Sequence, residues 1–128
     1  MAAAPAAFGA QVVVTVTGVR DDLGTVRVAI CPRTDFLKPA CPYSGRTPAR
    51  VGTVVVTIDD VPPGLYAAQA YQDANNNGIL DRNWLGFPQE GMGFSNNALF
   101  KLGPPSFVDA AFTVTADTIR ISFRLRYF

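Results

Sequence analysis

The sequence contains no histidine, only two lysines (Lys38 and Lys101) and a single glutamate, Glu90. Without histidine, the chain cannot form a Ser-His-Asp or Cys-His nucleophile or a His-ligated zinc site. Charged residues make up only 16% of the chain and the net charge is +1. No general electrostatic attraction to nucleic acid or to an anionic membrane is therefore expected, and any partner must be recognised locally.

The sequence also lacks a long apolar run, since none approaches the roughly 20 residues that a membrane-spanning helix needs. No transmembrane segment is expected. The small Ala/Pro-rich residues at 1–9 are typical of a flexible leader that follows a removed signal peptide. Residues 10–128 are long enough for one core and are predicted to form a single domain, in the periplasm or outside the cell.

The remaining sequence is rich in β-branched residues that alternate with polar ones, and no segment shows a helical period. Residues 119–127 are the clearest case, with Ile119, Phe123 and Leu125 expected to face inward and the intervening arginines outward. Short strands joined by Gly/Pro turns predict an all-β, antiparallel two-sheet sandwich, prealbumin-like or immunoglobulin-like, of about seven strands with a long ordered loop. Tyr66, two residues after Gly64, fits a tyrosine corner in which its hydroxyl bonds backbone near the turn.

The stretch from Pro32 to Pro48 contains four prolines and is expected to be a long loop, because proline excludes both a regular helix and a central strand. Cys31 and Cys41 flank much of it. Their spacing is not that of a CxxC redox or zinc motif, so a structural disulfide in an oxidising compartment is favoured over a reactive dithiol or half of a metal site.

An ordered set of motifs runs from Tyr66 to Phe107: Asp73-Ala-Asn-Asn-Asn-Gly-Ile-Leu-Asp81, Leu-Gly-Phe-Pro, Glu90-Gly, Gly-Phe-Ser-Asn-Asn97 and Gly-Pro-Pro-Ser-Phe107. Together with the Val-Thr-Val-Thr-Gly strand before it, this set closely resembles the bacterial DUF2141 family from about Gln11 to Tyr127. The resemblance implies export and a transthyretin-type (prealbumin-like) sandwich, and it supplies no activity.

Within these motifs, the spacing of oxygen-bearing side chains matches the first nine positions of a calcium loop. The candidate ligands are Asp73, Asn75, Asn77, the backbone carbonyl of Ile79, and Asp81. The position where an EF-hand carries its bidentate glutamate is Trp84, so this is not an EF-hand and any Ca²⁺ affinity should be low. The alternative is an ion-free turn, because Asn tolerates left-handed φ and forms Asx-turns.

Aromatic residues of the same loop form a second candidate site. Trp84, Phe87 and Phe94, with Glu90 beside them, could bind an apolar, sugar or peptide ligand. Alternatively, these rings are the small core of the loop itself and seal one end of the sandwich.

The outward arginines of the last strand, Arg120, Arg124 and Arg126, with Arg27 on another strand, could bind an anionic polymer. Alternating charges on a strand are more often a solvated face or a protected edge.

Three functional hypotheses follow. The first is an exported, non-enzymatic binding or structural module, with Ca²⁺ as a possible stabiliser of the Asp73–Asp81 loop. The second is an envelope- or carbohydrate-acting enzyme that uses the loop carboxylates, and the two separate on whether Asp81 and Glu90 face an open pocket or are consumed by backbone hydrogen bonds. The third is self-association through strand edges. The sequence identifies no catalytic residue, ligand or envelope partner.

Overall fold

The computed structural model describes residues 9–38, 41–76, 90–99 and 103–127. Within them the chain forms eight strands and two short helical turns. The strands are β1 (Ala10–Val19), β2 (Thr25–Cys31), β3 (Tyr43–Pro48), β4 (Gly52–Val61), β5 (Gly64–Asp73), β6 (Met92–Phe94), β7 (Ala111–Val114) and β8 (Ile119–Arg124), and the turns are the 3₁₀ helix η2 (Ser95–Asn97) and the α-helix α1 (Phe107–Ala110). Apart from Gly9, the leader expected at 1–9 lies outside the described residues.

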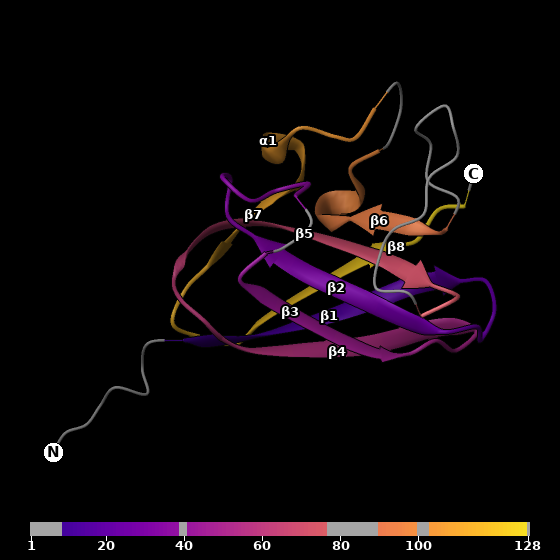
Figure 1. Ribbon diagram of the computed structural model, residues 1–128. Helices are drawn as coiled ribbons and strands as arrows, with labels where there is room; N and C mark the ends of the chain where they lie inside the picture. Colours follow the sequence, from indigo (N-terminus) through magenta and orange to yellow (C-terminus); the bar gives the residue numbers. More distant parts are fainter. Residues whose placement is uncertain (1–8, 39–40, 77–89, 100–102, 128) are drawn as a thin grey trace, which may run out of the picture.

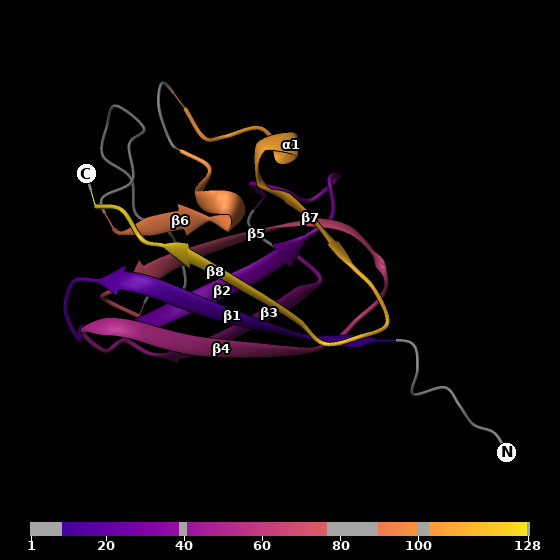
Figure 2. The same ribbon diagram turned by 180° about the vertical axis from the view of Figure 1, so that it is seen from behind.

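The strands form two sheets that lie face to face (Figures 1 and 2). One has three strands in the order β4-β1-β8, and the other has five, in the order β3-β2-β5-β6 with β7 also paired to β5. The predicted all-β sandwich is therefore confirmed. One pair departs from the antiparallel expectation, because β8 runs parallel to β1. A parallel pair needs a long crossover, and here all the intervening strands supply it.

The main core fills the space between the sheets and follows the predicted alternation. Alternate residues are buried in residues 10–16 of β1, 26–30 of β2 and 54–58 of β4, and β8 contributes Phe123. Leu125, just beyond β8, continues the pattern. β-branched side chains suit such a pleated, one-sided surface, so the repeated valines explain both the strands and their register.

The expectation of an unbroken loop from Pro32 to Pro48 was wrong at its end, because residues 43–48 form β3. β3 is the outermost strand of its sheet and pairs only with β2. Proline is tolerated on an edge strand, where a missing N–H breaks no central ladder, and Pro48 is the last residue of β3. The short helix α1 was also not predicted, since a single turn is too short to show a helical period; a capping box between Ser106 and Asp109 begins it.

The tyrosine corner is confirmed. Tyr66 is buried, and its hydroxyl donates a hydrogen bond to the carbonyl of Pro62 at 2.8 Å. The ring packs edge-on against Tyr43 of β3, with centroids 5.8 Å apart. This contact ties the turn between β4 and β5 to the edge of the five-stranded sheet.

A second, smaller core covers the outer face of the five-stranded sheet. It contains Cys31, Ala67 and Met92 together with three rings, Phe36, Phe94 and Phe107. Figure 1 shows the corresponding segments, including α1 and the turn after β6, on the side of β2 and β5 away from the three-stranded sheet. The middle of the five-stranded sheet, at β2, β5 and β6, is therefore covered on both faces, whereas the edge strand β3 is not.

Candidate functional site

Of the predicted metal- and ligand-site residues that the structure describes, Asp73, Asn75 and Glu90 lie at one end of the sandwich, where β5 ends, whereas Phe94 lies farther along, opposite Gln69 of β5. Asp73 is the last residue of β5, Asn75 lies in the turn after it, and Glu90 and Phe94 lie where the chain returns. Asn77, Ile79, Asp81, Trp84 and Phe87 lie outside the described residues. The calcium ligands and the aromatic platform thus remain predictions at those five positions.

Asp73 is completely buried, at 0% exposure, and its Oδ2 accepts a hydrogen bond from Nε of Arg27 at 2.9 Å. Arg27 was expected to join the arginines of the last strand. This was only one of two alternatives for these arginines, and it does not hold for Arg27, because β2 belongs to the other sheet and the Arg27 side chain turns to Asp73. A buried carboxylate needs such a partner, since an uncompensated charge away from water is costly. Any cation binding at this loop would have to share Asp73 with Arg27.

The turn after β5 uses asparagine in a left-handed conformation. Asn76 has φ of 56°, and its backbone N–H donates to the carbonyl of Asp73 at 3.1 Å. Its side-chain oxygen accepts a hydrogen bond from the hydroxyl of Thr25 on β2. Asparagine tolerates this backbone region better than other non-glycine residues. The first described positions of the loop are therefore held to the sheet by protein contacts.

Glu90 joins the two ends of the loop. Its carboxylate accepts the backbone N–H of Ala74 at 3.0 Å, and the residue is 8% exposed. Next to this contact, the N–H of Gln72, two residues before Ala74, donates to the carbonyl of Gly91, one residue after Glu90, at 2.9 Å. These two hydrogen bonds clasp the outgoing strand to the returning one, so that the base of the loop is fixed.

A partly buried polar network around Gln72 at the same end was not predicted. The hydroxyl of Tyr127 donates to the side-chain oxygen of Gln72 at 2.6 Å and accepts the N–H of Arg20 at 2.9 Å. The amide nitrogen of Gln72 donates to the carboxylate of Asp21 at 2.7 Å and to the carbonyl of Leu23 at 2.9 Å. Every polar atom of the Gln72 amide is therefore engaged, which is what burial of this residue requires.

The titratable groups of this network respond to their surroundings. The Leu23 backbone N–H, supported by the Gln72 amide and the Arg20 charge, lowers the pKa of Asp21 below its ordinary value of 3.8 against a smaller effect of burial. Burial raises the pKa of Tyr127 above its ordinary value of 10.0, opposed by the Arg20 N–H. The guanidinium of Arg20 also lies 4.3 Å from the centre of the Tyr127 ring. At neutral pH, Tyr127 is therefore a neutral donor and Asp21 a charged acceptor.

Two glycines of the motif set are explained by close approach. A Cβ atom on Gly91 would lie 2.3 Å from a carbon of the Tyr127 ring, and one on Gly93 would lie 2.2 Å from the carbonyl oxygen of Arg124. β6 also bridges the sheets, because Met92 and Arg126 exchange backbone hydrogen bonds of 3.0 and 2.8 Å. The two sheets are thereby joined along this edge.

The Ser95-Asn96-Asn97 motif ties three segments together. Ser95 is buried, accepts the N–H of Ala68 on β5 at 2.9 Å and donates to the carbonyl of Ala110. Ala68 lies between the part of β5 that pairs with β7 and the part that pairs with β6, so the serine hydroxyl completes the ladder at this gap.

The two asparagines of the motif also link separate segments of the chain. Asn96 donates to the carbonyl of Ala111 at 2.8 Å, and Asn97 accepts the N–H of Arg124 at 3.0 Å. Both adopt positive φ, of 61° and 52°, a region that asparagine tolerates. The motif thus connects β5, β7 and β8, which accounts for its side chains without a ligand.

Phe94 is 1% exposed and belongs to the second core. Its ring packs edge-on against Phe36 at 5.9 Å, and Phe36 packs against Phe107 at 5.8 Å. The disulfide between Cys31 and Cys41 is confirmed. Because it closes the segment that carries Phe36, it holds this part of the outer layer against β2 and β5.

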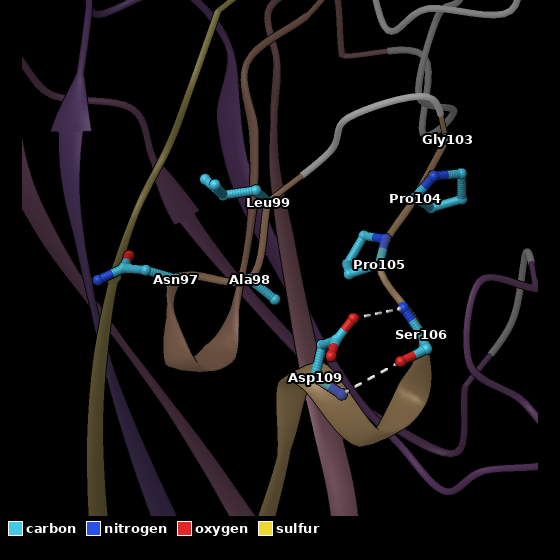
Figure 3. A pocket seen from close by; sticks show the side chains of 8 residues that line it. All are labelled: Asn97, Ala98, Leu99, Gly103, Pro104, Pro105, Ser106 and Asp109. Atoms are coloured by element: carbon cyan, nitrogen blue, oxygen red, sulfur yellow. Dashed lines mark hydrogen bonds between the residues drawn. The ribbon is translucent and has the colours of Figure 1, made fainter.

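A depression of about 530 Å³ lies beside α1 (Figure 3). It is lined by Asn97, Ala98, Leu99, Gly103, Pro104, Pro105, Ser106 and Asp109. The carboxylate of Asp109 turns to the backbone N–H of Ser106 as part of the helix cap, at 3.3 Å. Among the described residues no group of three or more carboxylates, cysteines or histidines could hold a metal ion. No described helix is long and apolar enough to cross a membrane.

The fold and these contacts define an all-β sandwich domain with a second layer over one sheet and a loop clasped at its base. The chain belongs to the family described as "Uncharacterized protein conserved in bacteria (DUF2141)", whose model matches residues 14–122. The resemblance of its motifs is thereby confirmed. No curated protein and no solved structure matches the chain.

Proposed function

We propose that the protein is an exported, non-enzymatic binding module. The observation that carries this proposal is the use of Glu90. Glu90 is 8% exposed as a residue, and its carboxylate accepts the N–H of Ala74, so it fixes the base of the loop. Asp73 is likewise buried and paired with Arg27. A catalytic carboxylate would instead need access to a substrate.

Export is supported by the disulfide between Cys31 and Cys41. Disulfides persist in oxidising compartments such as the periplasm or the extracellular space and are rare in reducing ones. Fractionation of the native host, with the redox state of the two cysteines measured by alkylation, tests this part. Reduced cysteines in a cytoplasmic fraction would contradict it.

The enzymatic alternative is tested by incubating the protein with acidic and neutral polysaccharides and measuring new reducing ends. We expect none above the buffer control, and no difference between wild type and Glu90→Gln. The matched measurement is thermal unfolding, where Glu90→Gln should lower the melting temperature because the amide is a weaker acceptor for the Ala74 N–H. Release of reducing ends that Glu90→Gln abolishes would overturn the proposal.

Calcium binding to the Asp73–Asp81 loop is a separate proposal that rests on the spacing of its oxygen ligands. Because Arg27 already neutralises Asp73, calcium must compete with an internal cation. The proposal therefore predicts that Arg27→Gln, which frees the carboxylate, gains more thermal stability from about 5 mM CaCl₂ than wild type does. Asp73→Asn should gain none, and MgCl₂ is the control. Equal responses in all three proteins would remove calcium from the account.

A further inference from the structure

Four exposed arginines lie along one side of the three-stranded sheet. Arg120 and Arg124 lie on β8, Arg126 follows the strand, and Arg20 follows β1. We call these four residues the arginine strip. Their backbones contribute to this end of the sandwich, since Arg124 and Arg126 bond to Asn97 and Met92 and the N–H of Arg20 bonds to Tyr127. The side chains of Arg120, Arg124 and Arg126 take no part in those contacts.

The register of the sheet places the strip beside a row of hydroxyl and β-branched side chains. Arg120 lies next to Val13 of β1, Ser122 next to Thr15, and Arg124 next to Thr17. On the other side of β1, Thr57 and Val55 of β4 continue the same rows. Successive residues of a strand face opposite sides, so these side chains share the outer face of the sheet. No described segment covers that face in Figure 2.

Three of the four positive charges of the strip are not neutralised within the described part of the chain. There, side-chain salt bridges are formed by Arg20 with Asp21, at 3.7 Å, and by Arg27 with Asp73. Arg120, Arg124 and Arg126 have no carboxylate partner among these residues. In a protein with a net charge of only +1, this is a local concentration of cations.

The shape of the strip favours a linear ligand. A rise of about 3.3 Å per residue places Arg120 and Arg124 about 13 Å apart along β8, and Arg126 follows two residues beyond Arg124. A single small anion is usually held in a pocket, whereas a straight row on an open sheet suits a chain that carries repeated charges. The guanidinium of Arg20 is held over the Tyr127 ring at one end, which restricts its motion.

The neighbouring side chains favour a polysaccharide over a nucleic acid. Binding of single-stranded nucleic acid relies on aromatic side chains on which bases stack, and the described residues of this face are Thr, Val, Ser, Gln, Asp and Arg. Hydroxyl groups such as those of Thr15 and Ser122 can hydrogen-bond sugar hydroxyls. Arginine binds carboxylates through two parallel hydrogen bonds, which lysine cannot do.

We propose that the outer face of the three-stranded sheet binds a linear acidic polysaccharide, with Arg120, Arg124 and Arg126 contacting successive carboxylates and Thr15, Thr17 and Ser122 contacting the sugars between them. This inference rests on the proposed function, since it names the class of ligand of a non-enzymatic module.

The test measures the Kd of the full chain for polygalacturonate at low salt, with neutral dextran and single-stranded DNA as the other probes. The strip variant is Arg120→Gln with Arg124→Gln. The matched control, Arg46→Gln with Arg50→Gln, removes the same charge from two exposed arginines on β3 and the turn after it. Thermal unfolding establishes that both variants are folded. The length of the polymer is measured after each incubation.

We expect wild type to bind polygalacturonate and not dextran, and the strip variant to raise Kd about tenfold or more, with less than about a twofold change in the control. Equal loss in both variants would reduce the binding to non-specific attraction and overturn the inference. Tighter binding of DNA, or no binding of polygalacturonate by wild type, would also overturn it. Shortening of the polymer would instead overturn the non-enzymatic function itself, so the two failures are distinguishable.

Discussion

The outer face of the five-stranded sheet lies beneath Phe36, Phe94 and Phe107, whereas the outer face of the three-stranded sheet carries threonines, valines and arginines that the described residues leave uncovered. Both sheets share the same main core, so the difference lies in their second faces. Where a second layer exists, charged side chains are paired or bonded to backbone, as Asp73 and Glu90 are. On the open face, Arg120, Arg124 and Arg126 have no carboxylate partner among the described residues.

The largest expected effect distinguishes the covered face from the open one. Phe94→Ala removes a ring from the second core and should lower the free energy of unfolding by about 3–5 kcal/mol. Val55→Ala, at a side chain 53% exposed on the open face, should change it by less than about 0.5 kcal/mol. Urea unfolding of both variants measures the contrast. Similar losses would mean that the second layer contributes no real core.

Loss of the disulfide should have the next largest effect. Replacing Cys31 and Cys41 together by serine opens a loop with a sequence separation of 10 and should cost about 2–3 kcal/mol. Reduction of the wild-type protein is the matched measurement. Because the bond holds the segment of Phe36, the loss should be accompanied by exposure of apolar surface to a hydrophobic dye, and an unchanged dye signal would count against this account.

Removing a charged partner should likewise cost more unfolding free energy on the covered face than on the open face. Asp73→Asn leaves Arg27 without its buried partner and should cost about 2 kcal/mol, reduced from a fully buried pair because Arg27 is 27% exposed. Asp59→Asn, on the open sheet, disturbs only an exposed hydrogen bond from Gln11 and should be nearly neutral. Chemical unfolding of the two variants and of Asp73→Asn combined with Arg27→Gln tests this. The double variant should recover part of the loss.

The smallest effect concerns Tyr127. Tyr127→Phe loses the hydrogen bonds to Gln72 and Arg20 and should cost about 1 kcal/mol. Burial raises the folded-state pKa of this group above 10.0, so its stabilising contribution is complete below pH 10.0 and is lost as pH rises through the folded value. Melting temperatures measured from pH about 8 to about 11 should therefore fall less steeply in the variant. Burial also raises the pKa of Tyr66, so the variant should retain the part of the pH dependence of stability that comes from Tyr66.

Local pattern was sufficient to predict much of the fold. Three features could be predicted because each depends on residues close together in the sequence. They are the alternation in residues 119–127, the spacing of Gly64 and Tyr66, and the two cysteines without a metal motif. β3 was missed because the effect of Pro48 depends on whether the strand is central or at an edge, and only the sheet order settles that.

The candidate site was less predictable, because its contacts join positions far apart in the chain. The pairing of Arg27 with Asp73 follows from the register of β2 against β5. The network of Gln72 with Asp21 and Tyr127 likewise needs three separate segments to meet. The Ser-Asn-Asn motif was singled out from the sequence, but its role depends on the contact of Ser95 with β5. That the serine completes a gap in the ladder of β5 could not be predicted from the motif alone.

The parallel pairing of β8 with β1 makes completion of the three-stranded sheet depend on the last strand of the chain. β1 is the central strand of its sheet, and its second neighbour is made only after every other described strand. Until then one edge of a valine-rich strand stays bare, and the inner core lacks Phe123. Such distant contacts slow folding. A chain without β8 would therefore expose an unpaired strand edge, which is a site at which β proteins aggregate.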